Sequence, residues 1–186
     1  MRTAVIAADG CEEGETLTII DILRRAQIGC ELVGLDKAEA TGAHGITIAC
    51  DRVLGEDVAD YDMVILPGGY GGADAMCASA VLRGVLMKMH EAGKKLAAIC
   101  AAPEAFDRAG LLAGKNFTCY PTVRERIRHG TWREDKVVVD GNLITGKGPA
   151  VVWAFAYKLV DELGGDSLTV KKRMVYFNAF DVREDE

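Results

Sequence analysis

The sequence has few of the residue patterns that hold metals or nucleotides. No two of its six cysteines form a Cys-x-x-Cys pair, and its three histidines have no ligand spacing to them or to each other. These residues are Cys11, Cys30, Cys50, Cys77, Cys100, Cys119, His44, His90 and His129. The glycine-rich loops that bind dinucleotides or nucleotide phosphates are missing as well. We therefore predict no metal site and no bound cofactor.

An excess of positive charge is also missing. Twenty-two Lys and Arg face 28 Asp and Glu, which gives a net charge of -6. A chain without a basic patch cannot neutralise phosphates, so we expect no nucleic-acid partner and no acidic membrane surface as a partner. No apolar run approaches the roughly 20 residues needed to cross a bilayer. No secretory signal is visible after Met1, so we expect a cytoplasmic protein whose cysteines are reduced.

What the chain does have is enough apolar material for a sizeable core, since 49% of its 186 residues are hydrophobic. This length and composition favour a single domain over residues 1–186. The acidic stretch Asp181–Glu186 is expected to be a flexible tail.

Buried strands alternate with helices along this chain. Continuous apolar runs predict strands, and positions repeating every three or four residues predict helices. The predicted strands are Thr3–Ala8, Cys30–Leu35, Ile46–Cys50, Asp62–Leu66, Leu96–Ile99, Phe117–Tyr120 and a hairpin of Val137–Val139 with Leu143–Thr145. The predicted helices are Thr16–Gln27, Val81–Glu91, Pro103–Arg108, Val151–Leu163 and Ser167–Tyr176. This order predicts an α/β sandwich, with a mostly parallel sheet covered on both faces and a small antiparallel appendage.

Cys100 stands where a buried strand runs directly into a helix, in the stretch KKLAAICAAPEAF. A sharp strand-to-helix corner with a nucleophile at its apex requires small neighbours, and alanines flank this thiol. Pro103 suits the first helical turn, which places the sulfur at a helix start. The partial positive charge there favours a thiolate, so we predict a lowered pKa and a catalytic cysteine. The alternative is a cysteine that only packs between strand and helix.

Two other segments leave strands at the same sheet edge. Glu15 lies at the start of the first predicted helix, where it either complements the helix dipole or exchanges a proton with the thiol. Gly68 and Gly69 follow another buried strand, and they form either a tight turn or a pair of backbone amides that bind an oxyanion.

The stretches ADGCEEGET, VILPGGYGGA, AAICAAPEAF, YPTVRERI and ITGKGPA occur in this order. Together they resemble the ThiJ/PfpI superfamily over about residues 1 to 165, and within it the branch of the parkinsonism-associated deglycase and its bacterial YajL-like relatives. The resemblance implies a flavodoxin-like sandwich, which is usually a homodimer. It also implies Cys100 as nucleophile, Glu15 as its protonated partner, and amides of Gly68, Gly69 and Ala101 around the oxyanion.

The chain departs from the family pattern at three positions. Ala102 replaces the glycine that commonly precedes the elbow proline, which is a small change. Ala101 stands where protease-like members have a histidine, so we expect no peptidase activity. Tyr120 replaces the histidine of many glyoxalase-competent members. It is a possible substrate contact but a poor base near neutral pH, which argues against strong turnover.

Two functions follow from this resemblance. The first is a glutathione-independent glyoxalase or deglycase that acts on methylglyoxal, glyoxal or early glycation adducts. Cys100 is then the nucleophile, and Glu15 is the acid and base. The alternative is a redox sensor or redox-regulated chaperone that uses the same oxidisable cysteine without turnover. A glutamine amidotransferase would need a late histidine and glutamate pair, whereas the last histidine is His129.

Overall fold

The computed structural model describes residues 1–179, and the predicted tail at 181–186 lies outside them. Within this range a seven-stranded sheet forms the centre of the molecule, in the spatial order β10-β11-β7-β6-β1-β2-β5. Its neighbouring strands run parallel except for β10, which is antiparallel to β11 at one edge. The strands are β1 (Arg2–Ala7), β2 (Gly29–Gly34), β5 (Arg52–Val53), β6 (Met63–Leu66), β7 (Lys95–Ile99), β10 (Val137–Asp140) and β11 (Leu143–Gly146).

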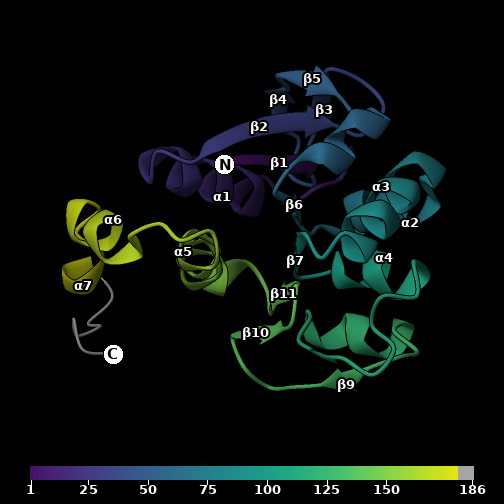
Figure 1. Cartoon of the computed structure of the whole chain (residues 1–186). Coiled ribbons are helices and arrows are strands. Elements are labelled where there is room, and N and C mark those ends of the chain that lie inside the picture. Colours follow the sequence, from purple (N-terminus) through teal and green to yellow (C-terminus); the bar gives the residue numbers. More distant parts are fainter. Residues whose placement is uncertain (180–186) are drawn as a thin grey trace.

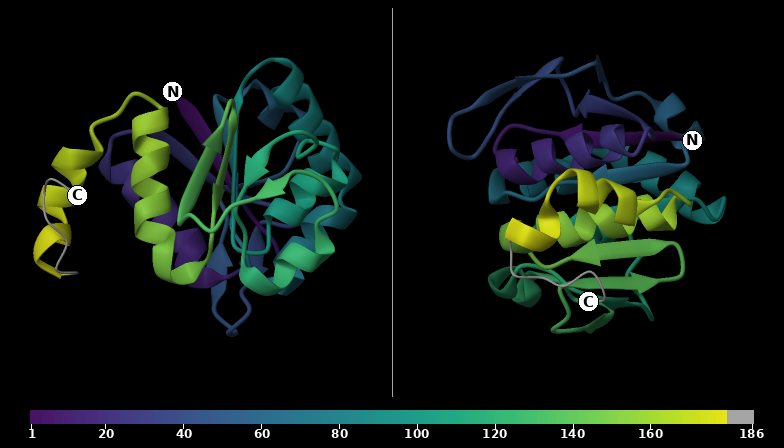
Figure 2. Two further views of the ribbon diagram at one scale, coloured as in Figure 1. Left: turned by 90° about the horizontal axis from the view of Figure 1, so that it is seen from below. Right: turned by 90° about the vertical axis from the view of Figure 1, so that its left-hand side faces the viewer.

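Helices cover both faces of this sheet (Figure 2). One face carries α1 and α5, and the other carries α2, α3 and α4, while α6 and α7 lie outside α5 (Figure 1). The helices are α1 (Glu13–Arg25), α2 (Tyr70–Ala78), α3 (Ala80–Glu91), α4 (Pro103–Arg108), α5 (Val152–Glu162), α6 (Ser167–Arg173) and α7 (Tyr176–Ala179). Because both faces are covered, every residue of the apolar strand β6 is buried. The predicted α/β architecture is therefore confirmed.

The remaining elements are short. An antiparallel hairpin is separate from the main sheet, and two further strands pair in parallel. These are β3 (Glu39–Thr41) with β4 (Thr47–Ala49), and β8 (Asn116–Phe117) with β9 (Thr131–Trp132). The 3-10 turns are η1 (Glu56–Asp60), η2 (Pro121–Arg126) and η3 (Pro149–Val151). No helix among the described residues is long and apolar enough to span a membrane.

Several predicted boundaries were wrong. The first helix begins at Glu13 rather than Thr16, because the side chain of Glu12 accepts a hydrogen bond from a first-turn amide and so caps the helix. The glycine-rich stretch at residues 67–72 suggested a turn, but α2 begins within it at Tyr70. The strand predicted at Phe117–Tyr120 ends at Phe117, since Pro121 begins η2. The last predicted helix is divided into α6 and α7 by Val175, whose φ is +58°.

The strands β7, β6 and β1 lie side by side, and their carboxyl ends meet at one edge of the sheet. Open parallel sheets bind ligands at this edge, at the point where the order of the strands reverses. Here that point lies at β1, which has β6 on one side and β2 on the other. The β3–β4 hairpin is attached to the loop that follows β1. The amide of Gly10 donates to the carbonyl of Thr41 at 2.8 Å, and the amide of Ala43 donates to the carbonyl of Cys11 at 2.8 Å. The hairpin is therefore held next to this edge.

Candidate active site

Cys100 occupies the corner between β7 and α4 in a left-handed backbone conformation, with φ at +63°. This region is uncommon for a residue with a side chain, and it costs on the order of 1–3 kcal/mol. Two hydrogen bonds hold it there: the Cys100 amide donates to the carbonyl of Gly146 at 2.9 Å, and its carbonyl accepts from the amide of Tyr120 at 2.8 Å. Neighbouring strand and loop together fix the strained backbone, which is the arrangement found at nucleophile elbows.

Glu15 faces this corner from the first turn of α1 and is fully buried, with 0% of its surface exposed. Its Oε2 accepts a hydrogen bond from the amide of Gly68 at 2.7 Å. Among the described residues, its Oε1 has no hydrogen-bond partner although it is buried. Burial is the main cause that raises the pKa of Glu15 to about 7, and the Gly68 amide only partly opposes it. The carboxyl group therefore exchanges its proton near neutral pH.

Gly68 lies between these two side chains because β6 lies between β7 and β1. A Cβ atom at this position would stand 2.5 Å from Cβ of Cys100, 2.9 Å from its Sγ and 2.7 Å from Oε2 of Glu15. Real Cβ atoms do not approach other atoms this closely, so only glycine leaves room for both groups. The thiol of Cys100 and the carboxyl group of Glu15 therefore both pack against Gly68.

The predicted lowering of the Cys100 pKa is wrong. Burial raises the pKa of Cys100 to about 12, and the negative charge of Glu15 acts in the same direction. The amides of Gly69 and Ala101 lower this pKa, but they do not compensate for the loss of water around a group that is only 7% exposed. The thiol therefore keeps its proton while Glu15 is ionised.

The three predicted oxyanion amides divide into two kinds. The Gly68 amide is already engaged by Glu15, so the structure does not leave it free for an oxyanion. The amides of Gly69 and Ala101 act on the sulfur of Cys100, which places them next to the position where charge would develop. Gly69 has φ at +88°, and a Cβ atom there would overlap backbone atoms of Gly10, Cys11 and Glu12 in the β1–α1 loop, so a side chain would not fit.

A pocket of about 270 Å³ opens above the thiol. It is lined by Glu12, Ala43, His44, Gly69, Tyr70, Cys100, Ala101, Tyr120 and Pro149. The rings of Tyr70 and Tyr120 meet edge to face with centroids 6.3 Å apart, which forms an aromatic wall. Tyr120, the predicted substrate contact, thus lies in the pocket that contains Cys100. The pocket is of a size for a small molecule.

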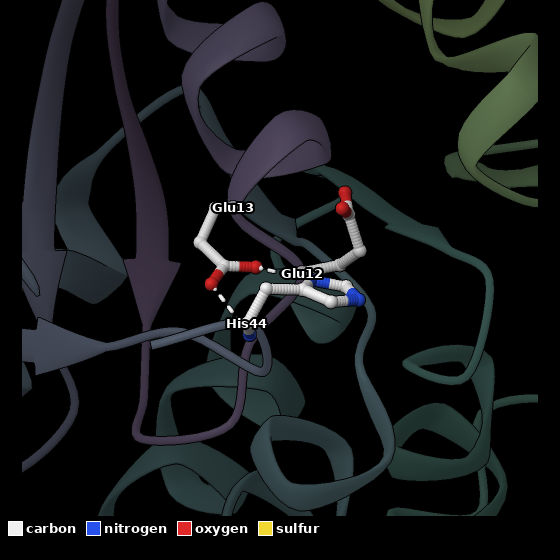
Figure 3. Close-up of side chains that lie close together, drawn as sticks. All are labelled: Glu12, Glu13 and His44. Atoms are coloured by element: carbon white, nitrogen blue, oxygen red, sulfur yellow. Dashed lines mark hydrogen bonds and ion pairs between the residues drawn. The ribbon is translucent and has the colours of Figure 1, made fainter. Parts of the chain in front are cut away.

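His44 is a pocket residue that the sequence did not point to (Figure 3). It comes from the tip of the β3–β4 hairpin, and its Nδ1 lies 2.9 Å from Oε2 of Glu13. The same carboxylate accepts the His44 amide through Oε1 at 2.7 Å. Burial raises the pKa of Glu13, but the hydrogen bonds from His44 and neighbouring amides outweigh it and lower the pKa to about 2. The Glu13 carboxylate raises the pKa of His44 in turn.

Glu12, Glu13 and His44 also place possible metal-ligand atoms within 4.8 Å of one another. Three of the four carboxylate oxygens already accept hydrogen bonds: both oxygens of Glu13 from His44, and Oε2 of Glu12 from the Glu15 amide. A cation would have to displace these bonds, so we assign no metal to this group.

Fold and site together define a class of protein: a flavodoxin-like α/β sandwich with a cysteine at a strand-to-helix elbow and a buried glutamate across from it. The DJ-1/PfpI family model matches residues 1–162. The chain belongs to this family.

Individual relatives agree with this assignment. Protein dj-1beta of Drosophila melanogaster is 39% identical over 165 residues, which cover 87% of this chain and 88% of that protein. Its crystal structure superposes with a TM-score of 0.88 over 94% of this chain and 97% of that one, and confirms the predicted fold class. A deglycase of Thermococcus kodakarensis is 28% identical over 163 residues, or 86% of this chain and 98% of that protein.

Proposed function

We propose that the protein is a glyoxalase or deglycase that acts on small dicarbonyls or their early glycation adducts, with Cys100 and Glu15 as the reacting groups. The observation that carries the proposal is the contact of both side chains with Gly68, where a Cβ atom would overlap both of them. A nucleophile and a proton acceptor within reach of each other, below a small pocket, are the parts that carbonyl chemistry requires.

With methylglyoxal, the sulfur of Cys100 adds to the aldehyde carbon. Its proton passes through the Glu15 carboxylate to the aldehyde oxygen, which gives a hemithioacetal. Glu15 then removes the remaining proton from this carbon and returns it to the neighbouring carbon, while the proton of the new hydroxyl group passes to the neighbouring carbonyl oxygen. The product is a thioester of lactate, which water cleaves to lactate and the free thiol. Because burial raises the pKa of Glu15 to about 7, its carboxylate is a stronger base than an exposed one and is still available near neutral pH.

The family relative named a deglycase supports the wider substrate range, since glycation adducts carry the same carbonyl-derived carbons. Tyr70 and Tyr120 are 50% and 37% exposed at the mouth of the pocket, so the remainder of a glycated side chain has a path to solvent. A homodimer is part of the proposal as well, and light scattering on the purified protein tests it.

Lactate formation from methylglyoxal tests the proposed chemistry in the wild type, Cys100→Ser and Glu15→Gln. We expect turnover in the wild type and in the control Cys77→Ser, because Cys77 does not line the pocket, and no turnover in Cys100→Ser or Glu15→Gln. Equal rates in all four proteins would end the proposal.

A redox sensor remains the second candidate, because amides of Gly69 and Ala101 act on the sulfur and could hold a sulfinate. The raised pKa of Cys100 weighs against it, since the thiolate is the form that peroxide oxidises. Mass spectrometry after mild peroxide treatment separates the two. Selective oxidation of Cys100 without lactate formation would favour the sensor.

A further inference from the structure

The β3–β4 hairpin places an imidazole in the Cys100 pocket. We propose that His44 is a second acid and base of this pocket, which moves protons on the substrate oxygens while Glu15 moves them on the carbons. The proposal rests on the proposed function and adds a catalytic residue to it.

The first argument is that the imidazole is fixed through Nδ1, while the described part of the chain places no hydrogen-bond partner on Nε2. Oε1 of Glu13 accepts the His44 amide and Oε2 faces Nδ1, so one carboxylate fixes both the loop and the ring. Glu13 is itself buried, with 3% of its surface exposed. Nδ1 and Nε2 point outward from the ring in different directions, and Figure 3 shows the second nitrogen pointing away from Glu13.

The tautomer follows from the charge of Glu13. An ionised carboxylate only accepts hydrogen bonds, so Nδ1 carries a hydrogen in both the neutral and the charged ring. Nε2 is therefore the atom that gains and loses the proton. It is an N–H donor when the ring is charged and a lone pair when the ring is neutral. The His44 side chain is 73% exposed, so protons exchange freely with solvent.

A glycine in the hairpin allows the contact between His44 and Glu13. A Cβ atom on Gly42 would overlap Cγ, Cδ and Oε1 of Glu13, so only glycine lets the loop close over the carboxylate. The amide of Ala43 donates to the carbonyl of Cys11, which connects the loop to the segment before α1. His44 therefore holds its place relative to α1, the helix that also carries Glu15.

The protons balance when two groups act together on the hemithioacetal. Glu15 takes the proton from the former aldehyde carbon while Nε2 of His44 gives one to the neighbouring carbonyl oxygen, which yields an enediol. Glu15 then returns its proton to that neighbouring carbon, and Nε2 takes back a proton from the hydroxyl group of the first carbon. The thioester forms, and both groups recover their starting states.

This division predicts a bell-shaped pH dependence. Glu15 has to be ionised and His44 protonated, so activity rises with the ionisation of the first group and falls as the second loses its proton. Glu13 and Glu12 raise the pKa of His44, and they are the charged groups that face it. The other titratable groups of the pocket are Cys100, Tyr70 and Tyr120.

The test compares His44→Gln with His129→Gln over the pH range of the wild type, with methylglyoxal as substrate. His129 is a matched control, because its amide and its Nδ1 both contact one buried carboxylate, that of Asp107, at 3.1 and 2.8 Å. We expect His44→Gln to lose on the order of 10²-fold in kcat together with the high-pH limb, while His129→Gln behaves as the wild type. Glu13→Gln should shift that limb to lower pH, which a merely structural role would not do.

The outcomes are distinguishable. If the wild type forms lactate and His44→Gln retains both its rate and its high-pH limb, the role of His44 is overturned and the proposed function stands. If the wild type forms no lactate, the proposed function fails and the role of His44 fails with it. Thermal unfolding of each variant shows whether it is folded. Because the His44 side chain is highly exposed, we expect its replacement to leave the fold intact.

Discussion

Replacing Glu15 by glutamine removes a buried charge while keeping the shape of the side chain. Gln retains an oxygen that can accept the hydrogen bond from the Gly68 amide. Its amide group takes the place of Oε1, which has no partner among the described residues. The variant therefore differs from the wild type mainly in that it cannot ionise.

The size of the effect follows from the raised pKa of Glu15. Its rise from 4.5 to about 7 corresponds to roughly 3 kcal/mol of unfolding free energy, since each tenfold change is about 1.4 kcal/mol. Between these two pH values the unfolded chain releases the proton of Glu15 while the folded chain keeps it. The unfolded state then binds fewer protons, so this group lowers the stability of the wild type as pH rises from about 4.5 to 7.

Urea unfolding at a series of pH values between 4 and 8 measures this difference. We expect the stability of Glu15→Gln relative to the wild type to increase across this range by roughly 3 kcal/mol. Glu162→Gln is a control, because the hydrogen-bonded ion pair with Lys95 lowers the pKa of Glu162 from its usual 4.5. Its stabilisation is lost only below that pH, so the difference between this variant and the wild type should stay nearly constant from about pH 5 to 8. A difference between Glu15→Gln and the wild type that stays constant with pH would refute the assignment of a buried, protonated Glu15.

Three further predictions concern the same corner. Gly68→Ala should slow both lactate formation and alkylation of Cys100 by more than tenfold, because the new Cβ displaces the thiol or Glu15. Rates near the wild-type values would contradict this packing. In Glu15→Gln, the pH dependence of Cys100 alkylation should move to lower pH, since a negative charge that raises its pKa is gone; a shift to higher pH would contradict that cause. Cys100→Gly should be more stable than Cys100→Ala by about 1 kcal/mol in urea unfolding, as the left-handed backbone favours glycine, whereas the reverse order is normal elsewhere.

The sheet was largely predictable because its strands are short apolar runs with little polar material. Met63–Leu66 is one such run, and burial on both faces is typical of a parallel sheet covered by helices. The prediction for the glycine-rich segment after this strand was wrong. Its composition indicates a turn, but α2 begins within it and packs closely against the neighbouring backbone. Gly72 illustrates the reason: a Cβ atom there would stand 2.8 Å from the α-carbon of Cys11. Glycines in this segment allow two backbone segments to contact each other, and the periodicity of apolar residues in the sequence cannot predict such a contact.

Part of the site followed from topology alone. The carboxyl ends of parallel strands meet at one edge, so residues that follow β1, β6 and β7 had to be neighbours. His44 could not be found in this way, because it belongs to a hairpin outside the main sheet. Its place depends on the Ala43 and Gly10 hydrogen bonds and on the fit of Gly42 against Glu13, which are tertiary contacts.

The wrong prediction for the Cys100 pKa shows which physical effect dominates here. The sequence argument weighed a helix start that favours negative charge, and α4 does begin three residues after the thiol. That helix has only six residues, however, while the sulfur is enclosed by the elbow, Gly68 and the buried Glu15. Loss of water raises the pKa of the carboxyl group as well as that of the thiol. In the proposed function the pair therefore acts through transfer of a proton between its members, and we expect the reactivity of Cys100 to depend on the Glu15 carboxylate that receives this proton.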